Sequence, residues 1–370
     1  MKKLCVAVGL WLCVVAVGPV PVSAQPIGTD ITGINLCLYG DCEARGSYAA
    51  DVYGWPNPAT LPFGTLPFVA RGVFASTGYF RLNVGDIGAD VTSGTATLAY
   101  DPFIFQVNAV YAEADGWPRS LPAGVNLRLR TRIVRLAAAV DLGRTSLGAK
   151  GLSLGLITAL PGLESNSRVS LGSLTLMKTT EKKEIDLTLG LHWRGGKKDW
   201  FAVGAFVDRV RNHVTVDGLD FTTGPFHAFG ATNAWFTRAG VSLLPFVPMD
   251  LADAATPLGE LASEVRLGAD FEHQNIAVPM EGSRRRQTGY LGVDARVIPD
   301  ALNPLSDYVR LYVIAGADTN GGWGIGPGIY GNGPLQFLSC NPAYSSRPIT
   351  GSLGSRLDVW AASCSITIPF

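Results

Sequence analysis

Apolar and polar residues alternate strictly between residues 184 and 194 of this chain. The apolar positions are Ile185, Leu187, Leu189, Leu191 and Trp193, and the polar positions between them include Glu184, Asp186, His192 and Arg194. Alternation with a period of two predicts a β-strand whose two faces meet different environments. The pattern recurs in segments 264–273, 290–297, 308–317 and 360–370, which predicts an all-β chain.

Weaker alternation marks further candidate strands. These are segments 68–75, 79–86, 94–101, 103–113, 125–141, 151–160, 168–178, 200–211 and 234–246. Together with the clear cases they predict about fourteen strands, and counts from twelve to sixteen stay open. The alternation changes phase near Arg135 and near Gly172, where we expect bulges or rim positions.

Strands of this kind fit a membrane only as a closed barrel. Beyond the N-terminal region no stretch has 18 or more consecutive apolar residues, although mean hydropathy is +0.22. In lipid every backbone donor and acceptor must be paired internally, and helices and closed barrels alone achieve this. The 44 glycines and the low charged fraction of 16% suit many strands joined by tight turns. The predicted fold class is therefore a transmembrane antiparallel β-barrel.

The final strand carries a compartment signal. Phe370, Ile368, Ile366 and Cys364 fall on one face of it, and the chain ends on the aromatic residue. Such an ending resembles the outer-membrane β-barrel proteins of Gram-negative bacteria. The resemblance implies location in the cell outer membrane, the barrel assembly machinery as a partner, and Ile366, Ile368 and Phe370 as the assembly signal.

Three regions follow from the N-terminal sequence. Residues 1–24 combine a basic start, an apolar run and a small-residue site before Gln25, which predicts a cleaved signal peptide. Residues 25–67 are too rich in proline for barrel strands, and we expect either a plug-like segment folded into the lumen or a periplasmic extension. Residues 68–370 form the predicted barrel. An even strand count places both chain ends in the periplasm.

That orientation assigns the connections. We expect outer connections at 179–183, 217–233, 274–286 and 318–354, shorter inner turns such as 195–198 and 299–307, and a short helix within 248–259. The four cysteines of the mature chain allow three disulfide connectivities. Cys37 and Cys42 enclose a turn and suit a local disulfide. Cys340 and Cys364 suit a bond across a hairpin, but Cys364 shares the lipid-facing side of Phe370, which argues against a bond to a cysteine in a loop.

Charges balance, with 30 Lys and Arg against 30 Asp and Glu, and no basic tract suggests a nucleic-acid partner. Arg128, Arg130 and Arg132 share one face of segment 125–141, and the cost of placing Arg in lipid predicts that they form a ladder in the lumen. The same argument predicts further lumen-lining residues: Glu184, Asp186, His192, Arg194, Glu264, Arg266, Asp270, Glu272, Asp294, Arg296 and Arg310. These charges either form an electrostatic constriction or pair with one another and fill the barrel.

No catalytic constellation is predicted. His213 and His227 lie near predicted outer connections, but no Gly-x-Ser-x-Gly element accompanies them. The sequence predicts no enzyme activity, no cofactor and no metal site. The glycine-rich segment 320–333 is expected to form a surface loop, and residues 284–286, all Arg, either meet anionic lipid phosphates or are solvated.

Residues 57–61 (Asn-Pro-Ala-Thr-Leu) resemble the Asn-Pro-Ala-x-Leu/Met element that precedes the barrel in outer-membrane transporters of long-chain fatty acids and aromatic hydrocarbons. That resemblance implies a fourteen-stranded barrel with an N-terminal hatch. The Cys37/Cys42 pair and the charged lumen depart from the family's pattern.

Three functions therefore stay open. The first is passive uptake of a small, hydrophobic or amphipathic solute, gated by residues 25–67. The second is a polar, porin-like diffusion channel with a charged lumen. The third is a non-conducting structural or surface-binding barrel. Expected partners are outer-membrane lipid and lipopolysaccharide, the assembly machinery and the solute, and the sequence does not indicate an oligomeric state.

Overall fold

The computed structural model describes residues 57–62, 71–84, 87–116, 125–171, 173–196, 199–220, 224–249, 256–278, 282–331, 338–348 and 356–369. Several predictions fall outside these residues: the signal peptide, most of segment 25–67, the two boundaries at 24/25 and 67/68, the Cys37/Cys42 pair and Phe370. Those predictions remain untested.

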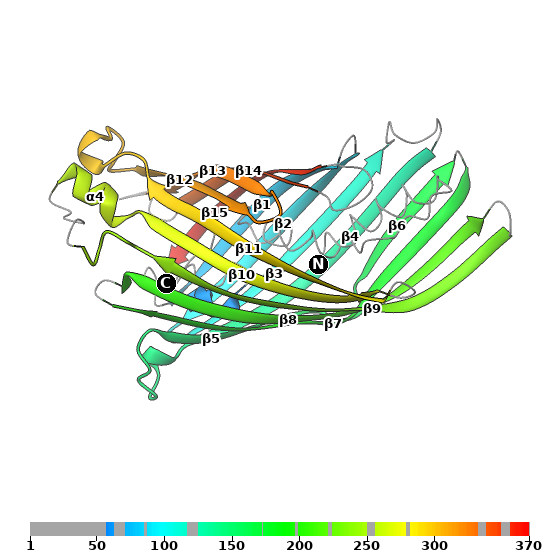
Figure 1. Ribbon diagram of the computed structural model, residues 1–370, viewed down its shortest axis with the longest axis horizontal. Coiled ribbons are helices and arrows are strands. Elements are labelled where there is room, and N and C mark those ends of the chain that lie inside the picture. The colour runs from blue at the N-terminus through cyan, green and yellow to red at the C-terminus, as the bar shows by residue number, and fades with distance from the viewer. Residues whose placement is uncertain are drawn as a thin grey trace.

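The described residues form one antiparallel sheet closed into a barrel (Figure 1). Its strands are β1 (Arg71–Val84), β2 (Ile87–Tyr100), β3 (Phe103–Gly116), β4 (Val125–Asp141), β5 (Leu152–Ala159), β6 (Glu164–Leu171), β7 (Leu174–Gly195), β8 (Phe201–Asp220), β9 (Gly224–Leu243), β10 (Arg266–Val278), β11 (Gly282–Arg296), β12 (Val309–Asp318), β13 (Trp323–Gly331), β14 (Leu338–Pro348) and β15 (Arg356–Pro369). Apart from β5 and β6, neighbours in sequence pair. β15 pairs with β1 from Gly72↔Pro369 to Val84↔Leu357, which closes the ring.

Strands β5 and β6 occupy a single position in the wall. β4 pairs with β6 through residues 125–131 and with β5 through residues 135–141. β7 does the same on the other side. The two short strands are thus one wall strand interrupted at residues 160–163, where Pro161 lacks the backbone N–H that a ladder needs. Fifteen strands therefore fill fourteen positions, the number predicted.

The predicted count is right although several predicted segments are not. Segments 68–75 and 79–86 are one strand, β1, and residues 179–183 lie inside β7 instead of in a connection. The predicted outer connection 318–354 contains β13 and β14, so the glycine-rich segment 320–333 is mostly strand, and Cys340 lies in β14. No register shift accompanies Arg135, whereas the β6–β7 register shifts between Val169 and Ser170, close to the second predicted irregularity.

The barrel has two ends, which we call the near rim, where β1 begins and β15 ends, and the far rim. Far-rim connections are mostly short, for example 85–86, 221–223 and 279–281. The longer ones, including 244–265 and 297–308, lie at the near rim, so the predicted asymmetry is reversed. At the far rim the strands themselves lengthen: β7 has 22 residues and β8 and β9 have 20 each, and they project from the barrel in Figure 1.

Short helical segments accompany the near rim and the lumen. They are η2 (Pro58–Thr60), η3 (Leu142–Arg144), α4 (Pro257–Ser263) and η5 (Asp300–Leu302). The helix predicted within 248–259 is α4, displaced toward β10.

No helix in the described parts of the chain is long and apolar enough to cross a membrane.

An apolar belt covers the outer wall. Along β3 the residues Phe103, Phe105 and Val107 are exposed, whereas Ile104, Gln106 and Asn108 between them are buried. The belt continues around the barrel through exposed Leu98, Leu189, Leu191, Val203, Leu267, Phe271 and Leu291. Lipid contact explains why these large apolar side chains face outward.

Aromatic residues border the belt at both rims. Near the near rim Trp193 packs edge-on against Phe201 with ring centroids 5.1 Å apart. Toward the far rim Tyr344 lies between Trp323 and Trp360, at 5.4 and 4.5 Å. Such girdles mark the two interfaces of a membrane with water.

Candidate functional site in the barrel lumen

The turn at residues 57–61 is docked against the inner wall. Asn57 caps η2: its Oδ1 accepts from the backbone N of Ala59 at 3.1 Å, and its Nδ2 donates to the carbonyl oxygen of Leu191 in β7 at 3.1 Å. Pro58 occupies the first helical position, where a missing N–H costs nothing. Ser153 of β5 donates its hydroxyl to the carbonyl oxygen of Ala59. Each residue of the motif thus has a structural task in holding the turn to the wall.

Two glycines make room for this turn. Gly155 of β5 and Gly190 of β7 are paired in the register. A Cβ at position 155 would collide with the backbone of Pro58 and Ala59, and one at position 190 would collide with Asn57. The sequence signal for this dock is a glycine inside an alternating Leu-Gly-Leu segment, which indicates close backbone approach.

Leu61 completes the dock with an apolar contact. It is 9% exposed and belongs to a buried cluster with Ala99, Ile104, Ala137, Ala139 and Ile157, on the inner faces of β2 to β5. A second apolar cluster lines the inner wall farther toward the far rim. Its members are Val210, Ala234, Phe236 and Ile276 on β8, β9 and β10.

Between these apolar clusters the inner wall carries paired charges. Arg238 of β9 contacts Asp270 of β10 through its Nε, 2.7 Å from Oδ2, and Glu272 through its Nη1 at 3.4 Å. All three side chains are at most 2% exposed. The Arg238 guanidinium also lies 3.9 Å from the centre of the Tyr290 ring, a cation–π contact.

A second charged group lies on β4 and β7. Arg135 Nη2 is 2.9 Å from Asp186 Oδ2, and Lys183 contacts the same carboxylate. Nearby, Thr188 donates to Asp208 of β8 at 3.2 Å. Arg135 and Lys183 thus share the carboxylate of Asp186, so the charged groups described at this level are engaged with one another. This agrees with the predicted alternative of mutual pairing.

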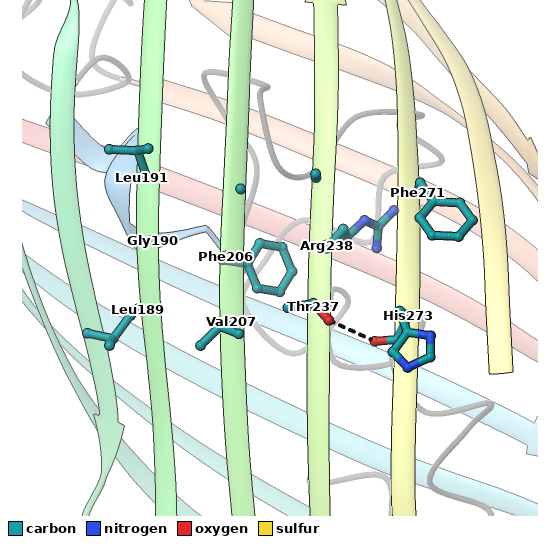
Figure 2. Close-up of a pocket in the computed structure, with 11 residues that line it drawn as sticks. Leu189, Gly190, Leu191, Phe206, Val207, Thr237, Arg238, Phe271 and His273 are labelled. Atoms are coloured by element: carbon teal, nitrogen blue, oxygen red, sulfur yellow. Dashed lines mark hydrogen bonds between the residues drawn. The ribbon is translucent and has the colours of Figure 1, made fainter. Parts of the chain in front are cut away.

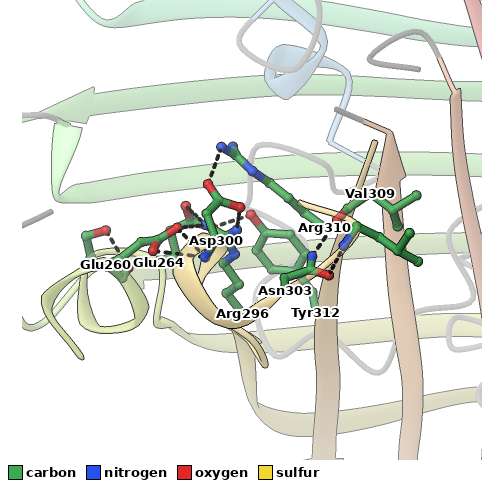
Figure 3. Close-up of polar contacts among 10 residues, drawn as sticks. Glu260, Glu264, Arg296, Asp300, Asn303, Val309, Arg310 and Tyr312 are labelled. Carbon is green, nitrogen blue, oxygen red and sulfur yellow. Dashed lines mark hydrogen bonds and ion pairs between the residues drawn. The ribbon is translucent and has the colours of Figure 1, made fainter. Parts of the chain in front are cut away.

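A third group closes the near rim around Arg296, the last residue of β11 (Figure 3). Its guanidinium contacts Glu260 of α4 and Asp300 of η5, and lies 3.4 Å from Glu264. Arg310 of β12 reaches Asp300 at 3.0 Å. Burial of Asp300 acts to raise its pKa, but the hydrogen bond from Arg296 and the charge of Arg310 outweigh it, so this pKa lies below its ordinary value.

Most of the predicted lumen residues lie on the inner wall or at its near-rim end. They are Asp186, Arg194, Glu264, Arg266, Asp270, Asp294, Arg296 and Arg310. Several partners in these groups were not predicted as lumen residues: Arg135, Lys183, Asp208, Arg238 and Tyr290. Glu272 was predicted. Alternation alone marks a face and does not show which members of it meet.

The arginine ladder is a correction. In β4 the residues Thr131, Ile133 and Arg135 are buried and face the lumen, so Arg128, Arg130 and Arg132 face outward. Continuous pairing of β4 with β3 sets Arg132 beside Tyr111 on the outer face. Glu184 is also wrongly assigned: it is the extra residue where the β7–β8 register shifts, and it pairs with exposed Arg211 at 2.8 Å.

Two hollows in the described part of the wall lie on its outer side. One of about 540 Å³ lies over β7 to β10, where the small side chains of Ala205 and Ala239 sit among Leu189, Leu191 and Phe271 (Figure 2). Another, of about 490 Å³, is lined by Val73, Leu98, Phe105, Val107, Leu136 and Leu156. Both belong to the apolar belt, so acyl chains would cover them.

The C-terminal predictions gain a register. Ile366 and Ile368 lie opposite Ala75 and Val73 in the register. Ala75 and Val73 are exposed on the outer wall. Cys340 and Cys364 are direct partners across β14 and β15, which removes the objection that Cys340 is in a loop. A disulfide between them stays a prediction.

No protein-family profile matches this chain, and no curated protein sequence matches it. Solved structures are similar to it: the monoaromatic hydrocarbon channel CymD has a TM-score of 0.50 at 11% identity, covering 87% of this chain and 94% of that one. The toluene transporter TbuX of Ralstonia pickettii has 0.48 at 11%, covering 87% and 95%. A FadL homologue of Pseudomonas aeruginosa has 0.47 at 12%, covering 90% and 97%.

The similarity to CymD shows the fold, that of an outer-membrane β-barrel. It confirms the predicted fold class and, at the level of the fold, the resemblance to aromatic hydrocarbon and fatty acid transporters. The predicted outer-membrane location agrees with it.

Proposed function

We propose that this barrel lets a small hydrophobic or amphipathic solute cross the outer membrane passively, with the docked turn at residues 57–61 as part of the seal. The docked turn is the observation that carries the proposal. It lies inside the lumen, held by Asn57 and Ser153 and accommodated by Gly155 and Gly190. A merely structural barrel has no need to keep two glycines for a segment that is not part of its wall.

The apolar inner clusters support a hydrophobic solute. The cluster around Phe236 and Ile276 lies toward the far rim, and the cluster around Leu61 lies against the docked turn. Apolar walls bind apolar solutes because they release ordered water without leaving polar groups unpaired. CymD, whose fold this chain shares, is described as a monoaromatic hydrocarbon channel, and the proposal extends that solute class to this protein.

A polar diffusion channel is less well supported. Arg238, Asp270 and Glu272 are buried against one another, and Asp186 is shared by Arg135 and Lys183. Groups already paired in this way offer little to a passing ion.

Uptake by whole cells tests the proposal. Cells with and without the protein are treated with an uncoupler, and entry of a small aromatic fluorophore is compared with entry of a polar dye of similar size. We expect the protein to speed entry of the aromatic probe alone, with a rate proportional to its gradient. Faster entry of the polar dye would favour the porin-like channel, and no effect on either would favour a non-conducting barrel.

A further inference from the structure

The outward-facing arginines of β4 belong to a larger basic patch. Arg128 of β4, Arg168 of β6 and Lys178 of β7 are direct partners in the register, Arg128↔Arg168 and Arg168↔Lys178. All three are exposed. Like charges directly opposite one another in a sheet are destabilising, so a row of three cations needs a counter-charge.

Three more cations surround this row. Arg130 and Arg132 continue along β4, and Lys182 of β7 lies toward the belt, all exposed. The basic patch is thus Arg128, Arg130, Arg132, Arg168, Lys178 and Lys182. Arg130 is 2.8 Å from Glu113, which lies 3.7 Å from Arg128. In the register, Asp115 is the partner of Arg128 and Glu164 is the partner of Lys182. Asp217 is the partner of Lys178, and its carboxylate is hydrogen-bonded to His227 at 2.6 Å. Asp115 and Asp217 thus flank the row at its two ends, and Glu113 and Glu164 lie beside it. The six cations outnumber these four acids by two.

The position of the patch along the barrel is equally specific. On β3 the belt runs from Phe103 to Ala109 and ends at Tyr111, whose partner is Arg132. Arg132 lies 5.8 Å from the centre of the Tyr111 ring. From Phe103 to Tyr111 the strand rises about 26 Å along its own axis. Because barrel strands are tilted, this corresponds to roughly 20 Å along the membrane normal. The patch therefore begins where hydrocarbon ends and headgroups begin.

Phosphate is the anion that fits this level. A guanidinium binds two phosphate oxygens in a planar fork, and ammonium groups add charge to the same site. Neighbouring strands lie about 4.8 Å apart, so the three-cation row spans roughly 10 Å, enough for a headgroup with more than one phosphate. In the outer leaflet of an outer membrane such headgroups belong to lipopolysaccharide.

We propose that this basic patch is a binding site for the phosphates of lipopolysaccharide on the outer face of the barrel wall. The ligand rests with its acyl chains on the apolar belt of β3, β4 and β7 and its phosphates on Arg128, Arg168 and Lys178. This site is separate from the lumen and does not depend on the proposed transport.

Binding by the purified full-length protein in detergent tests the site. Lipopolysaccharide is titrated against the wild type, against R128Q/R168Q, and against the control R71Q/R144Q, which removes two exposed arginines at the near rim. We expect R128Q/R168Q to weaken binding by about tenfold or more, since charge-assisted hydrogen bonds are lost, and the control to bind like the wild type. Heat-modifiable migration in gel electrophoresis verifies that each variant is folded.

Two further ligands and one further variant decide the chemistry. Removing the phosphates from lipopolysaccharide should weaken its binding to the wild type. The resulting affinity should be no higher than that of intact lipopolysaccharide for R128Q/R168Q. Phosphatidylglycerol should bind more weakly than lipopolysaccharide. R128K/R168K should retain binding, because it keeps both charges. R168Q/K178Q, which should also weaken binding, replaces R128Q/R168Q if that variant fails to fold. Equal binding by R128Q/R168Q and wild type, equal binding of the stripped ligand, or tighter binding of phosphatidylglycerol would each overturn the assignment.

Discussion

Two glycines on neighbouring strands decide whether the N-terminal turn fits the lumen. Gly155 and Gly190 face Pro58 and Asn57 where any side chain would collide. The sequence shows that each glycine lies between two leucines. It does not show that the two glycines are neighbours, because the pairing of β5 with β7 depends on where β6 begins.

Gly190→Ala is expected to displace the docked turn. The added methyl group collides with Asn57, so the hydrogen bond to Leu191 is lost and the lumen becomes more open. Planar-bilayer recordings should show higher open probability or conductance than for the wild type. Gly94→Ala is the matched control, because a Cβ at position 94 has no heavy atom within 4 Å. Identical traces for all three proteins would show that the turn does not seal the lumen.

Arg238→Ala is expected to lower the free energy of unfolding by about 3–5 kcal/mol, since it leaves two buried carboxylates, Asp270 and Glu272, without this partner. The control is Arg81→Ala, which breaks a 2.9 Å pair with Asp90 whose side chains are both 51% exposed, and should cost about 0–1 kcal/mol. Urea unfolding in lipid vesicles measures both. Equal losses would mean that the buried group contributes no more than a surface pair.

The misplaced arginine ladder shows a limit of alternation at single residues. Within the belt, lipid makes the outer face apolar, so polarity identifies the lumen. Beyond the belt both faces meet water, and the rule that places Asp186 inside fails for Arg128.

At the scale of elements, the missed strands β13 and β14 have a physical reason. The inner face of β13 is made of Gly324, Gly326 and Gly328, which are buried and have no side chain to alternate with Ile325. Pro327 and, in β14, Pro342 also argue against a central strand. Pairing with β12 and β15 forms these strands in spite of weak local preference.

The near-rim group that joins α4 and η5 to β11 should loosen in acid. The pKa of Asp300 lies below its ordinary value in the folded protein, so its stabilising contribution is complete above the ordinary aspartate pKa and is lost as pH falls through the lowered one. Pepsin should therefore cut connections 244–265 and 297–308 faster well below about pH 4 than near it. In Asp300→Asn the carboxylate is absent at every pH. The rate of pepsin cleavage in this variant should therefore depend less on pH than it does in the wild type. Matching pH profiles for the two proteins would contradict this.

At the scale of the whole molecule, the two rims should face different compartments. Phe229 on β9 and Leu147 beyond η3 are each 74% exposed, at the far and near rims. A membrane-impermeant maleimide should label Phe229→Cys on intact cells, and Leu147→Cys only after the outer membrane is opened. Wild-type protein gives the background from the native cysteines. The reverse labelling would invert the barrel and, with it, the leaflet that meets the basic patch.

Closure through β1 and β15 has a consequence for biogenesis. Strand β15, the last described strand in sequence, pairs with β1, the first, so two segments that are far apart in sequence are neighbours in space. Loop closure over that separation is slow, and until it happens β1 and β15 each present an unpaired edge. A chain cut short by even one strand would keep both edges open and be a substrate for proteases. The wall can therefore close only once β15 is available to pair with β1.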